Sequence, residues 1–195
     1  MSKLKPTSFK IKSVKNIHPI VPIIILAIFG LLIYGGARFG IRAWAVYHIW
    51  DKPMNWDDDG VLIQATKYAC VPTCIVMFLK DQGIETTVAE IAWISSTDNT
   101  GTSSEGIQTA ANYYGFSVSK KHMNYEELMD ENLPALVFFT WEDFLHAVYV
   151  IPNPEDGTLV IKNPAMGYHV INEELVMNYF GIDHWDCFLL EKNPD

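Results

Sequence analysis

Charged residues are missing from one long stretch near the start of the chain. Between Lys15 and Arg38 there is no Asp, Glu, Lys or Arg, which leaves a 22-residue uncharged run, 16–37, centred on Ile23–Phe29. About 20 apolar residues cross the roughly 30 Å hydrocarbon core of a bilayer. A buried core helix and a cleaved signal peptide are the alternatives. The length of the run and the lack of a clean small-residue cleavage pattern favour a transmembrane helix over residues 16–40.

Acidic residues are also missing from the N-terminal tail, which indicates an orientation. Residues 1–15 contain five lysines and no acid, whereas the other flank of the apolar run has only Arg38 and Arg42 before the sequence turns acidic. Positive charge is retained on the cytoplasmic side of membrane helices. We therefore expect a single-pass membrane protein with a cytoplasmic N-terminus and an extracytoplasmic C-terminal domain.

Cysteine is scarce, with only Cys70, Cys74 and Cys187 in the chain. An odd and low count does not suit a disulfide framework. The cysteines and histidines also lack the spacing of a zinc site, and we interpret the acidic run Asp57–Asp59 as a solvated loop. The sequence therefore predicts no metal and no cofactor.

Positive charge is scarce beyond the tail. The net charge is −9, and the first 37 residues contribute +5, so the remainder of the chain has a charge of −14. Nucleic-acid binding needs a basic face opposite the phosphates, so we do not expect a nucleic-acid partner.

These features divide the chain into four parts. We predict a basic cytoplasmic tail at 1–15, the transmembrane helix at 16–40, a juxtamembrane linker at 41–60 and one globular domain at 61–195. Patterning within the domain predicts these elements in order: helices at 70–82, 87–95 and 104–114, a strand at 116–119, a helix at 125–129, strands at 135–140, 146–151 and 158–162, a helix at 172–179 and a strand at 185–191. Helices followed by an antiparallel sheet indicate an α+β domain.

Cys70 opens the first of these helices, which points to a nucleophile. A helix N-terminus and a nearby imidazolium both stabilise a thiolate, so we expect the pKa of Cys70 to be lowered. The alternative is that Cys70 is a small buried apolar residue, as cysteine often is. Cys74, one turn later, is assigned to the core.

Three further residues complete a candidate catalytic site. His146 begins a predicted strand and is the candidate base, and Asn163 ends the next strand, where its amide can orient the imidazole. Gln64 precedes Cys70 by six residues and is a candidate donor to an oxyanion. Taken singly, each has a structural alternative: a buried histidine, a turn-forming Asn-Pro and a polar loop residue.

In combination these residues resemble a known family. Gln64, Cys70, Cys74, an apolar helix ending at Gly83, then His146-Ala-Val-Tyr-Val-Ile and Asn163-Pro-Ala-Met-Gly resemble the bacteriocin-processing, double-glycine leader peptidases. The resemblance covers residues 61–191. It implies a papain-like cysteine peptidase fold, with a helical N-terminal half and a C-terminal antiparallel sheet. It also implies that Cys70 is the nucleophile, His146 the base and Gln64 the oxyanion donor.

The chain departs from that family in two residues. Asn163 stands where the family usually has Asp. Its amide can orient the imidazole of His146 but supplies no negative charge. Val71 follows the nucleophile where the family usually has Gly, which predicts a narrower approach to the thiol. Family members are often fused to exporters, whereas here we expect a stand-alone enzyme tethered by one helix.

We therefore predict a membrane-anchored cysteine peptidase with a Cys-His-Asn triad that matures a secreted or leader-bearing peptide. Its partners would be a peptide or protein substrate, the membrane and a component of a secretion system. Two alternatives remain: a papain-fold transpeptidase or cell-wall amidase, and a tethered peptide-binding module without activity.

Overall fold

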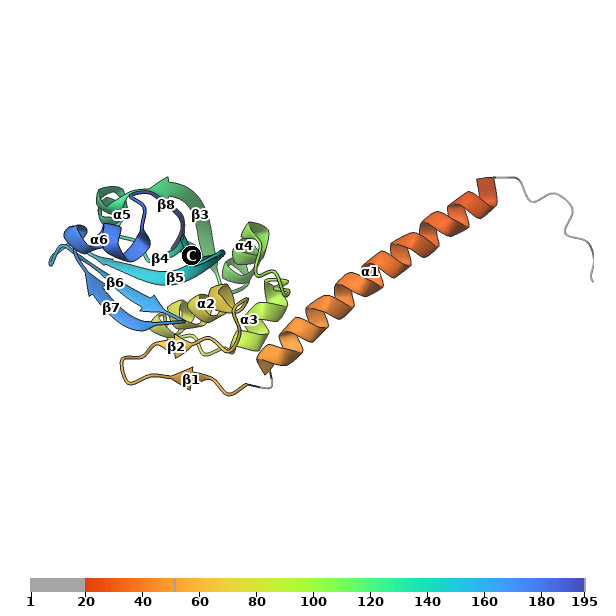
Figure 1. Cartoon of the computed structure of the whole chain (residues 1–195), viewed down its shortest axis with the longest axis horizontal. Coiled ribbons are helices and arrows are strands. Elements are labelled where there is room, and N and C mark those ends of the chain that lie inside the picture. Colours follow the sequence, from red (N-terminus) through yellow and green to blue (C-terminus); the bar gives the residue numbers. More distant parts are fainter. Residues whose placement is uncertain (1–19, 51, 195) are drawn as a thin grey trace, which may run out of the picture. The chain divides into compact units, whose positions relative to one another are not determined.

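Figure 1 shows a computed structural model of the chain, which describes residues 20–50 and 52–194. The predicted basic tail, 1–15, and the first four residues of the predicted transmembrane helix, 16–19, lie outside the described residues. The chain divides into two compact units, Met1–Phe39 and Gly40–Asp195. Each unit is described by itself below.

Helix α1 runs from Ile20 to Trp50. Every side chain from Ile23 to Ile41 is exposed, although most of them are apolar. Within the described part of the chain, one helix, over Ile23–Ile49, is long and apolar enough to cross a membrane, with a mean hydropathy of 2.0. Exposed apolar side chains on all sides of a helix suit a hydrocarbon environment rather than water.

The end of α1 belongs to the second unit and packs into its core. Ala45, Val46 and Ile49 are buried there, at a spacing that places them on one face of the helix. The sequence predicted a linker over residues 41–60. The structure instead has helix to Trp50, followed by a short hairpin of β1 (Asn55–Trp56) and β2 (Leu62–Ile63).

A six-stranded antiparallel sheet forms the centre of the second unit, with the order β3-β8-β4-β5-β6-β7. Its strands are β3 (Phe116–Met123), β4 (Ala135–Trp141), β5 (Phe144–Asn153), β6 (Thr158–Asn163), β7 (Gly167–Ile171) and β8 (Trp185–Lys192). The predicted hairpin of β5 and β6 is confirmed. Strand β7 was missed by the sequence analysis because its alternate side chains, Tyr168 and Val170, are exposed at a sheet edge and give no apolar run.

Five helices accompany the sheet: α2 (Cys70–Asp81), α3 (Val88–Ile94), α4 (Ser104–Tyr113), α5 (Tyr125–Glu131) and α6 (Glu173–Phe180). The predicted start of the second domain helix at Thr87 is confirmed, since the Thr87 side chain accepts a hydrogen bond from the Glu90 N–H. Gly83, the second residue after α2, has φ +75°, a conformation that favours glycine and ends the helix.

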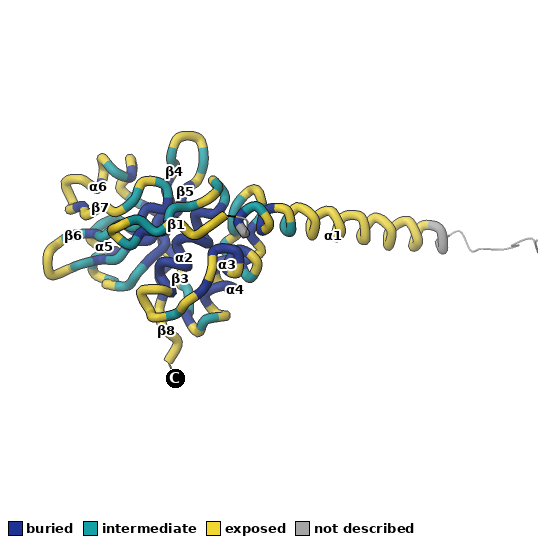
Figure 2. The backbone as a smooth tube through the Cα atoms, turned by 90° about the horizontal axis from the view of Figure 1, so that it is seen from below, coloured by how far each residue is buried: buried dark blue, intermediate teal, exposed yellow. Residues whose placement is uncertain are grey.

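Alternate residues along each central strand face two separate cores. Leu136 and Phe138 of β4 pack with α2, α3 and α4, whereas Val137 and Phe139 pack with α5 and α6. This alternation follows from the two-residue period of a strand. The sheet is therefore buried on both faces in its middle, as the tube in Figure 2 shows in dark blue. The predicted α+β class, with helices first and an antiparallel sheet afterwards, is confirmed.

Candidate active site

The candidate site forms where β6 stops pairing with β5. The last pair between them is Tyr149↔Lys162, whereas β4 continues alongside β5 down to Phe144. Residues 144–148 of β5 therefore have a strand neighbour on one side only. The start of α2 lies beside this part of β5, because both of its cysteines contact the backbone of Ala147.

Cys70 is the first residue of α2 and is 6% exposed. It borders a pocket of about 260 Å³ that is lined by Lys67, Tyr68, Asn99, Thr100, Gly101, Phe144 and Leu145. No side chain caps the first turn of α2, so this helix end offers backbone N–H groups without side-chain partners. A buried thiol that borders a pocket at a helix start is placed to meet a carbonyl carbon.

The pKa of Cys70 is raised rather than lowered. Burial of the thiol is the largest cause, and the backbone at Ala147, Val71 and Cys70 itself lowers the pKa in part, as amide donors to a thiolate do. The expected lowering was wrong because the thiol is buried at the helix start. Desolvation of the charged form then outweighs the favourable backbone groups.

Cys74 and Val71 of α2 both pack into the core. Cys74 is fully buried, and its Sγ donates to the Ala147 carbonyl at 3.4 Å, as suits a core residue. Val71, the departure from the family pattern, is 2% exposed and belongs to the core cluster that includes Phe78. Its side chain packs into the core and does not line the pocket beside Cys70.

His146 is fully buried in an aromatic environment. Its ring lies within 5.2–6.1 Å of the rings of Phe139, Trp141 and Phe144, measured between centroids. Burial lowers the pKa of His146, and the hydrogen bond that its ring donates to Asn163 raises it in part. The imidazole is therefore neutral at neutral pH.

Asn163 is held by three hydrogen bonds. Its Oδ1 lies 3.0 Å from His146 Nε2 and accepts from the Ala165 backbone N–H at 2.9 Å. Its Nδ2 donates to the hydroxyl of Tyr179 at 2.8 Å. The contact with Ala165 identifies the oxygen end of the amide, because a backbone N–H can only donate.

This arrangement assigns the tautomer of His146. The Asn163 oxygen can only accept, so Nε2 of His146 must hold the proton, and Nδ1 of the neutral ring holds the lone pair. Nδ1 is buried and has no hydrogen-bond partner within the described residues. Such orphaned buried polar atoms are uncommon in proteins. The free base nitrogen is therefore ready to accept a proton.

Gln64 joins the same region through its backbone. Its N–H donates to the Pro164 carbonyl at 2.8 Å, which ties the segment after β2 to the turn that follows Asn163. The side-chain Oε1 of Gln64 is buried and has no partner among the residues described.

The four predicted residues are thus brought to one region, but with unequal contacts. His146 and Asn163 are hydrogen-bonded, Gln64 is anchored one residue beyond Asn163, and Cys70 contacts the residue after His146. No hydrogen bond joins Cys70 to His146 Nδ1. Tyr179 was missed, since the sequence places it inside an ordinary short helix with no motif around it.

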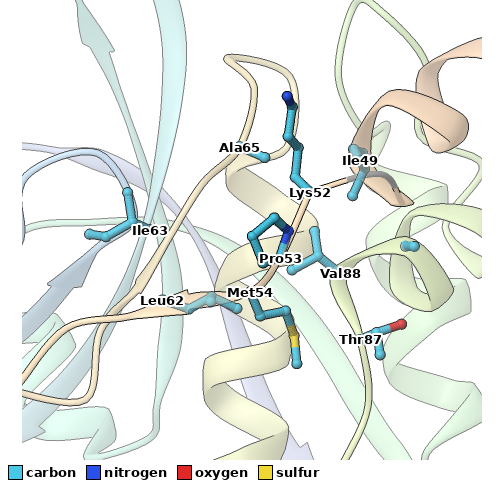
Figure 3. A pocket seen from close by; sticks show the side chains of 10 residues that line it. Ile49, Lys52, Pro53, Met54, Leu62, Ile63, Ala65, Thr87 and Val88 are labelled. Carbon is cyan, nitrogen blue, oxygen red and sulfur yellow. The ribbon is translucent and has the colours of Figure 1, made fainter.

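A second pocket lies beside the segment that contains Gln64. It has a volume of about 270 Å³ and is drawn in Figure 3; its lining residues come from the end of α1, the following segment, β2 and α3. Ile63 and Ala65, which flank Gln64, are part of this lining. Over residues 20–50 and 52–194, no group of three or more His, Cys, Asp or Glu side chains could hold a metal ion.

Comparison with known proteins gives a matching family, two relatives in sequence and two solved structures with the same fold. The model of the Peptidase C39 family matches residues 59–182. Uncharacterized proteins of two archaea are related in sequence. The one from Methanothermobacter thermautotrophicus is 26% identical over 63% of this chain and 84% of its own length. The one from Methanothermobacter marburgensis is 25% identical over 68% of this chain and 90% of its own length.

Two solved structures share the fold. The peptidase domain of Streptococcus ComA, a bifunctional ABC transporter involved in a quorum-sensing pathway, has a TM-score of 0.57 and 20% identity, and the match covers 68% of this chain and 98% of that domain. A double glycine motif protease from an AMS/PCAT transporter, solved with the leader peptide, has a TM-score of 0.58 and 16% identity. That match covers 73% of this chain and 100% of the protease.

Proposed function

The chain belongs to the Peptidase C39 family, and we propose that it is a membrane-anchored cysteine peptidase with Cys70 as nucleophile. The observation that supports this assignment best is the buried pair of His146 and Asn163. Their hydrogen bond at 3.0 Å leaves Nδ1 of His146 free, with Cys70 against the backbone of the next residue.

The proposed reaction begins from neutral groups. As Sγ of Cys70 attacks the peptide carbonyl carbon, its proton passes to Nδ1 of His146, which becomes an imidazolium. The thiol and Nδ1 are not hydrogen-bonded in the free enzyme, and such contacts often tighten when substrate binds. The Nε2–H of His146 stays hydrogen-bonded to Asn163 Oδ1 throughout the reaction, so the imidazole ring keeps its orientation.

The carbonyl oxygen becomes negatively charged in the tetrahedral intermediate. The backbone N–H of Cys70 and the side-chain amide of Gln64 would donate to it. Collapse breaks the C–N bond, and the leaving amine takes the proton from Nδ1. Water then attacks the thioester with His146 as base, which releases the carboxylate product and restores the thiol.

For the substrate we propose a leader-bearing peptide. The chain shares its fold with a double glycine motif protease that was solved with the leader peptide. A transpeptidase or a cell-wall amidase would use the same acyl-enzyme with a different acceptor or donor. Those two alternatives differ from the proposal in their products.

The length of α1 supports the proposed anchor. Its 31 residues would extend about 46 Å at 1.5 Å per residue. The hydrocarbon core needs about 20 of them, which leaves the last 11 to pack into the domain, where Ala45, Val46 and Ile49 are buried. The lysines of residues 1–15 favour a cytoplasmic N-terminus and an extracytoplasmic domain.

One comparison tests the activity and its substrate together. Peptides released by cells that express the full-length wild-type protein would be compared by mass spectrometry with those of cells that express Cys70→Ala or Cys74→Ala. We expect an unprocessed precursor with Cys70→Ala only. Normal processing by Cys70→Ala would refute the assignment, and a product joined to a new amine would identify a transpeptidase.

The orientation is tested by fusing a reporter after Asp195. Alkaline phosphatase activity is expected, because that enzyme folds only outside the cytoplasm. Fluorescence of a cytoplasm-specific reporter at the same position would reverse the proposed topology.

A further inference from the structure

The pocket that borders Cys70 is lined by three separate segments of the domain. They are the turn before α2 with Lys67 and Tyr68, the loop 99–101 before α4, and the start of β5 with Phe144 and Leu145. The volume of about 260 Å³ lies just below the roughly 300–1,000 Å³ of sites for drug-sized ligands, which suits one amino-acid side chain. Because Cys70 is part of the lining, that side chain would belong to a substrate residue close to the scissile bond.

One wall of this pocket is apolar and accessible to solvent. Leu145 is 64% exposed although it lies on a strand of the central sheet, and Phe144 and Tyr68 are half-buried. Apolar surface gains free energy when a ligand removes it from water. A substrate residue with a side chain can cover this wall, whereas a glycine cannot.

The loop that forms a second wall is held by its own hydrogen bonds. Asp98 and Gly101 exchange two backbone hydrogen bonds, at 3.0 and 3.1 Å. Beside them a chain of hydroxyl groups joins Ser95, Thr97 and Thr102, with oxygens 2.8 and 2.7 Å apart. The two residues between Asp98 and Gly101 are therefore held at the edge of the pocket.

Among the described residues that line the pocket, Lys67 alone carries a charge. Lys67 and Asn99 are exposed, and neither forms an ion pair or a side-chain hydrogen bond within residues 20–50 and 52–194. An ammonium offers three donors and an amide two, and both can donate to a carboxylate. This cation beside the nucleophile contrasts with the charge of −14 on the chain beyond residue 37.

The acidic residues nearest to these walls in the sequence do not line the pocket. The carboxylate of Asp98 accepts hydrogen bonds from the N–H and the hydroxyl of Thr100, at 2.8 and 2.5 Å. Glu142 and Asp143 form the exposed turn between β4 and β5 and are absent from the lining. The pocket therefore combines one positive charge and unused donors with an apolar wall.

We propose that this pocket determines specificity by binding an acidic side chain of the substrate, with Lys67 as the partner of the carboxylate. The methylene groups of that side chain would cover Phe144 and Leu145, and its carboxylate would accept from Lys67 and Asn99. The inference rests on the proposed function of the site. It narrows the substrate to peptides that present Glu or Asp at a fixed position close to the scissile bond.

A first measurement needs no peptidase activity. Iodoacetate and iodoacetamide differ only in a carboxylate and an amide, and both lose iodide as the Cys70 thiolate forms a C–S bond. Their rates at Cys70 would be followed by mass spectrometry of the full-length protein in detergent. Both reagents consume the same thiolate, so the ratio of the two rates cancels any change in the pKa of Cys70.

This ratio should depend on the charge at residue 67. We expect it to fall about threefold in Lys67→Met and about tenfold in Lys67→Glu, as one exposed charge pair is first lost and then reversed. High salt should lower the ratio in the wild type, because it screens exposed charges. Lys192→Glu, an equal charge change at an exposed position on β8, is the control and should leave the ratio unchanged.

A second measurement tests the peptide itself. The full-length enzyme in detergent would digest a library of synthetic peptides, with the cut sites read by mass spectrometry. Glu and Asp should be enriched at one position near the cut with the wild type, and this enrichment should disappear with Lys67→Met. Lys67→Glu should instead enrich Lys and Arg there. Two peptides that differ only in Glu or Gln at this position should differ about threefold in kcat/KM with the wild type.

Equal rate ratios in the wild type, Lys67→Met and Lys67→Glu would overturn the proposal, as would a library profile with no acidic preference. If the Lys67 variants do not fold, as judged by circular dichroism, the wild type decides: a ratio that does not fall with salt contradicts the charge pairing. Failure of the proposed function has a different signature. Cys70→Ala would retain hydrolysis, or the wild type would cleave no peptide while the rate ratio still responds to residue 67.

Discussion

The side-chain oxygen of Asn163 lies 3.0 Å from Nε2 of His146, and both residues are fully buried. An amide at this place orients the imidazole as a carboxylate would, but it adds no charge to a site that is already closed off from water. In the proposed reaction, the imidazolium would therefore be stabilised by geometry and one hydrogen bond rather than by an ion pair. The predictions below follow from this difference.

Replacement of Asn163 should move the acidic limb of the pH–rate profile. The pKa of His146 is below its ordinary value of 6.5, so activity should fall only as the pH drops through that lower value. In Asn163→Asp the nearby carboxylate favours the imidazolium and should shift the limb to higher pH with activity retained. Asn163→Ala should shift it to lower pH with a reduced rate. An inactive Asp variant would contradict the assigned role of residue 163.

Alkylation of Cys70 should depend strongly on pH. Burial holds the pKa of the thiol above its ordinary value of 9.0, so iodoacetamide should react slowly at pH 7 and progressively faster toward pH 10. Cys74 and Cys187 are fully buried and should stay unmodified in the native protein. Fast, pH-independent labelling of Cys70 between pH 6 and 7 would instead indicate a resting thiolate.

Loss of the Gln64 amide should affect turnover and leave thiol reactivity unchanged. Removal of one oxyanion donor typically lowers kcat by about 10²–10³ with little effect on KM. Alkylation of Cys70 forms no oxyanion, so its rate in Gln64→Ala should equal that of the wild type. Gln108→Ala, at an exposed position on α4, is the control for both assays. Equal losses in both assays would mean that Gln64 supports the fold and not the oxyanion.

The end of α1 should contribute to the stability of the catalytic domain. Ile49 is 3% exposed and packs in the core, whereas Tyr47, two residues earlier, is 65% exposed. Truncation of a buried Ile to Ala costs about 2–5 kcal/mol, so Ile49→Ala should lower the melting temperature in detergent, and Tyr47→Ala should not. Equal melting temperatures would show that this helix end is dispensable for the domain.

Much of the candidate site could be predicted because its residues occur next to strong local signals. Cys70 begins an apolar helix that ends at Gly83, and His146 and Asn163 flank a turn rich in Pro, Asp and Gly. Local patterns of this kind determine helices and hairpins at short range. The strand pairing of β5 with β6 then follows, and with it the proximity of His146 to Asn163.

Two long-range features were beyond prediction: the contact of Tyr179 with Asn163 and the packing of the end of α1. Tyr179 is 16 residues from Asn163 in the chain and lies on a helix whose packing depends on the whole sheet. The residues that end α1 were interpreted as a linker, because only the assembled core offers a surface on which Ala45, Val46 and Ile49 can be buried.

The sequence by itself determined the α+β class, the uncharged apolar run and the identity of the candidate nucleophile, base and orienting amide, because these depend on local periodicity and residue chemistry. Only the tertiary structure decided the electrostatic state of the site. It buries Cys70 and His146, which raises the pKa of Cys70 and lowers that of His146. Desolvation depends on every element packed around a group, so the order of residues along the chain does not reveal it.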